Sequence, residues 1–527
     1  MNKHDPITRF TPAENHLIET LNKTLDRDTA LAELKKLLQV AVQIELATIP
    51  IYLYTYYSIN RTVHSGENMR PSDIFANKTG GMIMSVAVEE MLHMSLSSNI
   101  LYSLGQMPKM YQLAPDSYPT LLPAHHQTDK WQPEGPDGSH DVKIPLGKLN
   151  YEQLWHFLQI EYPETMDAVP ENKDWKTIGQ VYSYVRCIIA TKWIEDEDFR
   201  KGSAEHQIQS FNYSPNNTDT VHTKGKFDPW SPAPETADPD AEPFVGKSAA
   251  EGAIYSNEED SHAGMTELVT ISGKEDAYVA IDTVCDQGEG YAQPHMHDLP
   301  TDDPSKHELS HYYKFLTIQG QFAEYKAHWE SGGLKERLPK YPAPPPPVEP
   351  TIGSGELAEV VIDYPDNPVT HEYPEELQPI SDFCNGVFQY MLVLTETLYL
   401  VPPQSQRLFF NEGMHRSMIW VLDKLIKTMR DIPITEGKHA GKSFAATFEN
   451  INLGPRENSF ATLGVLGKKA IAAAEALIAK DKAMDNPANS VIYYVQQALS
   501  ATDAQGAPQH LPDVKAFWDG DKPVPSN

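Results

Sequence analysis

The strongest constraint on the fold is a four-residue pattern, Glu-x-x-His, that occurs at Glu90–His93 and again at Glu308–His311. On an α-helix, residues three positions apart lie about 60° apart around the axis and about one turn along it. A carboxylate and an imidazole at this spacing therefore converge on one point, which suits a metal ion. A single copy of the pattern is usually a solvated helix face, so the prediction depends on companion residues elsewhere in the chain.

Two further acids stand on apolar stripes of predicted helices. Helical periodicity over residues 34–50 places Glu45 among apolar residues, and the segment 275–290 does the same with Glu289. An acid on a buried stripe is costly unless it meets a cation or a hydrogen-bond partner. Four such acids point to a shared counter-charge. The alternative, in which each acid pairs with its own Lys, Arg or Tyr, stays open.

The order of these residues indicates the architecture. A single Glu, a Glu-x-x-His, a long connection, a second single Glu and a second Glu-x-x-His are the order expected of a four-helix bundle with one long crossover that holds two metal ions. We therefore predict a mainly α fold, with the bundle in residues 1–330 and the crossover at about 106–274. A Pro-rich extended linker is predicted at 331–380, and a C-terminal helical region packed on the bundle at 381–527.

The predicted metal ligands follow from these patterns. Gly288 and Gly290 flank Glu289, and glycines mark a helix end more often than a helix interior, so Glu161 is kept as an alternative to Glu289. The predicted set is Glu45, Glu90, His93, Glu289, Glu308 and His311, with Glu161 as the alternative. Tyr52 and Tyr312 are candidate catalytic residues, although aromatic residues at helical spacing are more often packing groups.

Four segments of the chain match a known family: Ile44–Tyr54, Glu89–Met94, Gln287–Gly290 and Glu308–Phe315. On these segments the sequence resembles the ferritin-like domain of iminophenyl-pyruvate dimer synthases of bisindole pigment pathways and their stand-alone bacterial relatives. The likeness runs from about residue 28 to residue 448. It implies a ferritin-like four-helix bundle and an oxidative reaction on an amino-acid-derived substrate. The segment around Glu161 also resembles a family segment.

Composition excludes several classes of function. The formal net charge of -30, from 43 basic and 73 acidic residues, would repel nucleic acid and anionic membranes. The three cysteines, Cys187, Cys285 and Cys384, have no paired spacing, which argues against a disulfide framework and against a thiolate zinc site. The N-terminal residues lack the apolar core of a signal peptide, and no uninterrupted apolar run reaches membrane-spanning length. We therefore expect a soluble, cytoplasmic protein.

The remaining motifs favour oxygen chemistry. The sequence contains no Gly-rich phosphate loop, no Gly-x-Ser-x-Gly elbow and no dinucleotide fingerprint. Mixed carboxylate and imidazole ligands suit two iron ions, with manganese as the alternative. His295 and His297 stand near acids and would bind a second metal, although an exposed loop is the more common meaning of such a pair.

The leading hypothesis is a non-haem diiron oxidase or oxygenase that uses O2 or peroxide on a small organic substrate. An electron donor and an oligomeric state are left open. Two alternatives remain: a ferroxidase or other iron-handling protein, and a metal-free binding or structural protein that keeps only the bundle.

Overall fold

The structure is a computed structural model, and it describes most of the chain. The described residues are 10–61, 70–126, 141–163, 169–173, 175, 177–209, 268–288, 309–333, 346–482, 490–503 and 505–524. Within them the chain is mainly helical, with two short two-stranded antiparallel sheets, which confirms the predicted fold class.

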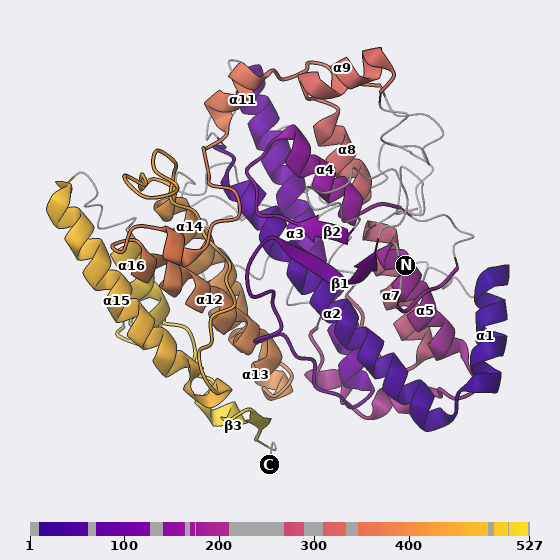
Figure 1. Cartoon of the computed structure of the whole chain (residues 1–527). Helices are drawn as coiled ribbons and strands as arrows, with labels where there is room; N and C mark the ends of the chain where they lie inside the picture. The colour runs from indigo at the N-terminus through magenta and orange to yellow at the C-terminus, as the bar shows by residue number, and fades with distance from the viewer. Residues whose placement is uncertain are drawn as a thin grey trace.

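Two long helices form the centre of the molecule (Figure 1). They are α2 (Arg27–Tyr57) and α3 (Pro71–Ser103), which pack along each other. Asp26 caps α2 by accepting the N–H of Thr29. An 18-residue window of α2 is long and apolar enough to cross a membrane, but 83% of that window is buried inside the protein. Its apolar composition is therefore accounted for by its position as a core helix.

Further helices surround this pair on the side of the N-terminus and the crossover. They are α1 (Pro12–Thr24), α4 (Tyr151–Ile160), α5 (Ile178–Ala190), α7 (Lys274–Gly288), α8 (His311–Gln319) and α9 (Ala323–Ser331). Helix α4 packs on α8, α8 and α7 both contact α3, and α5 packs on α2 and α7. The crossover helix α4 therefore joins α8 beside the central pair, and α7, the helix predicted over 275–290, also packs on α3.

The crossover also contains small elements. Strands β1 (Thr120–His126) and β2 (Asp141–Ile144) pair antiparallel, with Thr120 opposite Ile144. Two 3-10 turns follow, η1 (Asp196–Arg200) and η2 (Ala204–His206).

Two short elements lie in the described part of the region 331–380, which the Pro-rich sequence predicts to be an extended linker. They are helix α11 (Ser354–Val360) and the 3-10 turn η9 (Thr370–Glu372). Val361 forms an antiparallel bridge with Ile59 at the end of α2, and α11 contacts α3. These contacts attach the segment to the bundle. The backbone N–H and C=O groups just after the end of α2 need hydrogen-bond partners, and the segment supplies them.

The C-terminal region is helical and lies along one side of α2 and α3 (Figure 1). Its elements are α12 (Gln378–Thr397), α13 (Pro403–Phe409), the π-helix η10 (Phe410–Leu422), α14 (Asp423–Met429), η11 (Arg456–Asn458), α15 (Ser459–Lys480), α16 (Val491–Leu499), η13 (Lys515–Phe517), β3 (Trp518–Asp519) and β4 (Lys522–Pro523). Helix α12 packs against α15 and against η10.

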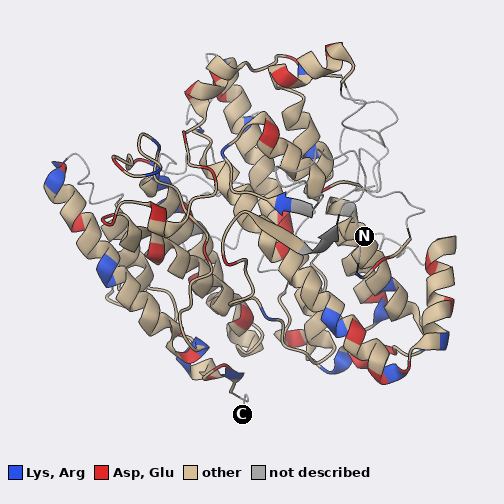
Figure 2. Ribbon diagram, in the orientation of Figure 1, with Lys and Arg blue, Asp and Glu red and all other residues tan. Residues whose placement is uncertain are grey.

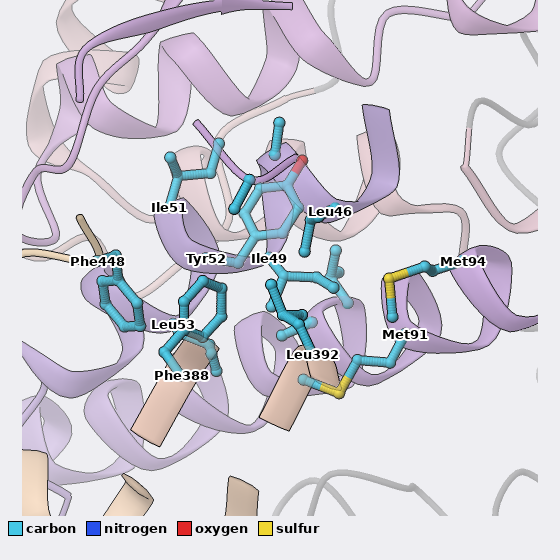
Figure 3. Packing of buried hydrophobic residues seen from close by; sticks show 14 of the residues in the cluster. Leu46, Ile49, Ile51, Tyr52, Leu53, Met91, Met94, Phe388, Leu392 and Phe448 are labelled. Carbon is cyan, nitrogen blue, oxygen red and sulfur yellow. The ribbon is translucent and has the colours of Figure 1, made fainter. Parts of the chain in front are cut away.

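One apolar core joins the bundle to the C-terminal region. Figure 3 shows Ile49 of α2 and Met91 of α3 packed toward Phe388 and Leu392 of α12, and all four side chains belong to the same buried cluster. Charged residues of both signs alternate along outer helices such as α15, as Figure 2 shows. The C-terminal helices therefore complete the core of the bundle.

Candidate metal centre

Three of the predicted ligands meet in the interior. Glu90 and His93 lie on α3, and His311 is the first residue of α8. One ligand atom from each of the three lies within 4.8 Å of the other two, and all three side chains are buried. One imidazole from each copy of the Glu-x-x-His pattern therefore reaches the same place.

Two more carboxylates complete this cluster. Glu45 Oε2 of α2 lies 3.9 Å from His93 Nδ1. Glu161, the residue that caps the C-terminus of α4, places its Oε2 3.5 Å from His311 Nδ1, and Glu90 Oε1 lies 3.0 Å from the same nitrogen. The two imidazole rings stack with their centroids 5.2 Å apart. We call these five residues the ligand cluster.

Hydroxyl groups hold the carboxylates of the ligand cluster in place. Tyr182 of α5 donates its phenol hydrogen to Glu45 Oε1 over 2.6 Å. Tyr52 donates to Glu161 Oε1. The Thr48 hydroxyl lies 3.2 Å from Glu90 Oε2 and donates to it. Each carboxylate thus has one oxygen bound to a hydroxyl, and its other oxygen faces the imidazoles or the neighbouring acids.

The outer nitrogen of each imidazole is bound to another side chain. His311 Nε2 donates to Glu89 Oε2 over 2.7 Å, and the Lys314 ammonium lies 2.7 Å from both oxygens of Glu89. His93 Nε2 and Gln287 Oε1 of α7 share a hydrogen bond of 2.9 Å. Metal-bound histidines in proteins have this arrangement, in which the second ring nitrogen donates to a carboxylate or carbonyl oxygen and fixes the ring.

Both Nδ1 atoms therefore face the interior of the ligand cluster. His311 Nδ1 is buried and makes no hydrogen bond of acceptable geometry, although a carboxylate oxygen is 3.0 Å away. A buried polar atom without a hydrogen bond costs about 1–3 kcal/mol. A metal ion is the partner that suits an inward ring nitrogen surrounded by carboxylates, so the residues present fit a metal site.

Burial and crowding perturb the acid–base behaviour of the cluster. Burial, followed by the charge of Glu90, raises the pKa of Glu45 well above its usual value, and the same two causes raise the pKa of Glu161. Burial alone would raise the pKa of Glu90, but the close approach of His311 and of Glu45 lowers it to about 2. Without a metal, burial and crowding therefore favour the protonated forms of Glu45 and Glu161, while Glu90 keeps its negative charge.

The two imidazoles differ from each other. Burial lowers the pKa of His93 to about 4. Burial also disfavours the charged form of His311, but Glu161 and Glu89 outweigh it and raise its pKa well above the usual value. Two stacked imidazoles, one that favours its neutral form and one that favours its charged form, thus lie among the carboxylates. A bound divalent cation would replace the proton on His311 as the positive charge that compensates these acids.

The structure locates most of the predicted ligands. It brings together Glu45, Glu90, His93, His311 and the alternative Glu161. Glu289, Glu308, His295 and His297 lie outside the described residues, so their assignments stay predictions.

One helix boundary differs from the prediction. The Glu-x-x-His pattern predicts a helix over residues 308–311. In the described residues α8 begins at His311, and the Ser310 side chain caps it by accepting the N–H of Tyr313, while Glu308 lies outside the described residues. A serine at this position is a strong helix-start signal, which the Glu-x-x-His pattern obscured.

The two candidate catalytic tyrosines have different surroundings. Tyr52 contacts the ligand cluster directly, since its hydroxyl binds Glu161. Tyr312 is buried against the aromatic rings of Tyr162 and Tyr313, with ring centroids 5.8 Å and 5.4 Å away. The catalytic assignment of both residues stays a prediction, and Tyr52 is the one placed where it can exchange a proton with a ligand.

Sequence patterns missed four residues that support the cluster: Glu89, Lys314, Tyr182 and Gln287. For two of them the sequence holds a usable signal. Lys314 follows His311 by three positions on a helix whose buried residues are mostly apolar, and a buried lysine requires a carboxylate partner. Glu89 directly precedes a predicted ligand. Tyr182 and Gln287 carry no such signal, because their roles depend on how α5 and α7 pack.

Comparison with known proteins identifies the family of this chain. A search of curated proteins finds no significant match. Among solved structures, the crystal structure of a ferritin-like protein from Caulobacter vibrioides is similar at 17% sequence identity and a TM-score of 0.35, with 74% of this chain and 96% of that chain covered. The Ferritin-like family model matches residues 38–228 and 234–320, which is more than half of the chain and includes every residue of the ligand cluster. This chain therefore belongs to the ferritin-like family.

Proposed function

We propose that this protein is a non-haem diiron oxidase or oxygenase that uses O2 or peroxide to oxidise a small organic substrate. The observation that carries the proposal is the ligand cluster, in which three buried carboxylates surround two imidazoles and His311 Nδ1 lacks a hydrogen bond. Five ionisable groups in one buried place are costly unless a cation compensates them.

The donor atoms indicate the kind of metal. Glu45, Glu90 and Glu161 offer oxygen, and His93 and His311 offer nitrogen. Oxygen with imidazole suits iron or manganese, whereas structural zinc prefers thiolates. Glu90 lies near both imidazoles and would contact either of two bound ions, and we propose the same role for Glu308, which lies outside the described residues.

Bound iron would supply the redox chemistry toward O2 or peroxide. The protein's own residues would control protons and geometry around it. Burial raises the pKa of Tyr52 well above its usual value, so its phenol stays protonated and holds a proton at Oη against Glu161. The Glu89 carboxylate and the Lys314 ammonium fix the His311 ring from outside the cluster. Burial of all these groups excludes bulk water from the site.

The substrate is proposed from the family resemblance. The pigment-pathway enzymes that the sequence resembles oxidise amino-acid-derived compounds, so we propose a small substrate of this class, with a separate electron donor and a cytoplasmic location. Neither nucleic acid nor membrane is proposed as a partner, because a chain with a net charge of -30 repels both.

The test is anaerobic loading with Fe(II) followed by iron counting and O2 uptake. We expect about two iron ions per chain, as in other carboxylate-bridged bundles. Glu90→Ala and His311→Ala should lose this iron, while His16→Ala, at an exposed position on α1, should keep it. Iron retained by both cluster variants would refute the ligand assignment.

Two further results would redirect the proposal. A protein that binds no iron after anaerobic loading would be a metal-free member of the family. A protein that accumulates many ferric ions per chain, without O2 uptake coupled to an organic substrate, would be an iron-handling protein.

A further inference from the structure

A small cavity lies between the central helices and the C-terminal region. Its wall includes five methionines, which are Met91 and Met94 of α3, Met391 of α12, and Met414 and Met418 of the π-helix η10. We call it the methionine cavity. Figure 3 shows Met91 and Met94 extending from α3 toward Leu392 of α12.

The wall of the methionine cavity is almost entirely apolar, so the cavity does not favour water. Thr395 supplies the only hydroxyl in its wall, and that hydroxyl already donates to the carbonyl oxygen of Met391 over 2.9 Å. A buried water needs about two to four polar partners, and cavities without them stay empty of water. The methionine cavity therefore offers water no hydrogen bonds in exchange for those it would lose.

Its size excludes an organic ligand. The volume is about 10 Å³, which is enough for one sphere of the size of a water molecule. Pockets for small organic molecules measure about 300–1,000 Å³. A space that is dry and this small fits a diatomic or monatomic apolar gas.

Its position links it to the ligand cluster. Met91 follows Glu90 and Met94 follows His93, while Leu46, also in the cavity wall, follows Glu45. Successive residues on an α-helix are about 100° apart around the axis. On both central helices, the face that bears the ligands thus adjoins the face that lines the cavity.

The wall is built from deformable parts. Methionine side chains are unbranched and change shape at little cost, and the π-helix is a rare conformation that is frequent at functional sites. A gas molecule enters a closed interior only when side chains move briefly apart. Five methionines, two of them on the π-helix, permit such motion more readily than branched or aromatic residues in the same places would.

From these observations we propose that the methionine cavity holds dioxygen beside the metal centre before it reacts. This inference rests on the proposed function in one respect, because it takes O2 as the co-substrate. The binding itself follows from size, dryness and position alone, so it can be tested separately from catalysis.

The direct test uses O2 as its own probe, because it is paramagnetic. The full-length protein is labelled with ¹³C at the methionine methyl groups and loaded with Zn(II) in place of iron. Relaxation is then measured under O2 and under N2. We expect strong, selective enhancement at the five cavity methionines, strongest at the four buried ones, and little at Met429, which is also buried but lies on α14 outside the cavity. Equal enhancement at Met429 and in the cavity would overturn the proposal.

A cavity-filling variant gives the second test. Leu392→Phe places a larger side chain in the wall, and Leu425→Phe makes the same change at a buried position of α14 away from it. Leu392→Phe should abolish the selective relaxation, and Leu425→Phe should leave it unchanged. In the iron-loaded enzyme, Leu392→Phe should raise the KM for O2 severalfold with unchanged iron content and unchanged kcat at saturating O2. An unchanged KM for O2 in an active Leu392→Phe enzyme would overturn the proposal.

The two proposals can fail independently. If the protein consumes no O2, the proposed function fails, while methyl relaxation still shows whether O2 occupies the cavity. If O2 is consumed but the cavity methionines show no selective enhancement, the cavity proposal fails and the proposed function stands.

Discussion

Replacing Glu89 by Gln tests whether the outer support of His311 controls metal binding. The Glu89 carboxylate binds the Lys314 ammonium through both oxygens at 2.7 Å and accepts from His311 Nε2 over 2.7 Å. Only 4% of Glu89 and 6% of Lys314 is exposed. Glu89→Gln keeps the shape of the side chain and one acceptor oxygen, but it leaves a buried ammonium without its counter-charge.

The expected loss of stability follows from this burial. Removing one partner of a buried ion pair costs about 3–5 kcal/mol, because the other charge stays buried. Since Gln still accepts one hydrogen bond, we expect Glu89→Gln to lower the free energy of unfolding by about 3 kcal/mol, at the low end of that range. Lys314→Met should cost a similar amount. The double variant, which has neither charge, should be less destabilised than the sum by about 1–3 kcal/mol.

Metal affinity should separate the roles of the two residues. Substitution of a group that orients a metal-bound histidine typically lowers affinity about 10–100-fold. We therefore expect Glu89→Gln to weaken metal binding by at least about tenfold, and Lys314→Met to weaken it less, because Lys314 acts on His311 only through Glu89. Urea unfolding measures the first quantity, and competition with a chelator measures the second.

A matched control lies in the C-terminal region. Asp423 and Lys427 form another ion pair with little exposure, with 3.0 Å between Asp423 Oδ2 and Lys427 Nζ, on the side of the molecule occupied by α12 to α16. Asp423→Asn should lower stability and leave metal affinity unchanged. Equal metal affinity in Glu89→Gln and the wild type, or strictly additive losses in the Glu89 and Lys314 variants, would refute the reasoning.

Three further outcomes are expected. Because the pKa values of Glu45, Glu161 and His311 are raised in the metal-free protein, these groups hold their protons to higher pH than ordinary carboxyl and imidazole groups, so metal binding should release protons and weaken as the pH falls. Calorimetry in buffers of different ionisation enthalpy measures the release, and no buffer dependence would contradict it. Glu396→Ala should lower the free energy of unfolding by about 3 kcal/mol, since it removes the acceptor of two backbone N–H groups and one of the two carboxylates that pair with Arg456, the other being Asp521, yet it should not change iron content. Removing the metal with a chelator should lower the thermal midpoint, because a ligand at about 100 times its dissociation constant stabilises the native state by about 2.7 kcal/mol; an unchanged midpoint in differential scanning calorimetry would count against metal binding to the native state.

The sequence was most informative where one side chain broke a regular pattern. Glu45 is an acid on an apolar helical stripe, and Glu90 and His93 repeat a spacing found elsewhere in the chain, so periodicity was enough to select them. Glu161 was harder to rank because it caps α4 with a non-helical backbone, so its side-chain direction does not follow from the helix period. His311 lies in the ligand cluster although its helix begins at that residue.

The rest depended on tertiary contacts that no local pattern contains. Glu89 and Lys314 are 225 positions apart, and nothing in either neighbourhood specifies the pairing. The π-helix η10 read as an ordinary helix because its wider turns carry no distinct pattern of apolar residues. The short helix α11 was hidden by the prolines around it, which dominate the composition of the linker.

The distance along the chain between the two halves of the ligand cluster has a consequence for biosynthesis. His311 is 222 positions from Glu89, so the N-terminal helices leave the ribosome long before their partner residue is made. Until then Glu45 and Glu90 have no imidazole from α8 to face, and closing α2 onto α3 would bury two uncompensated acids. We therefore expect the nascent bundle to stay open during translation, and to close only once α8 has emerged.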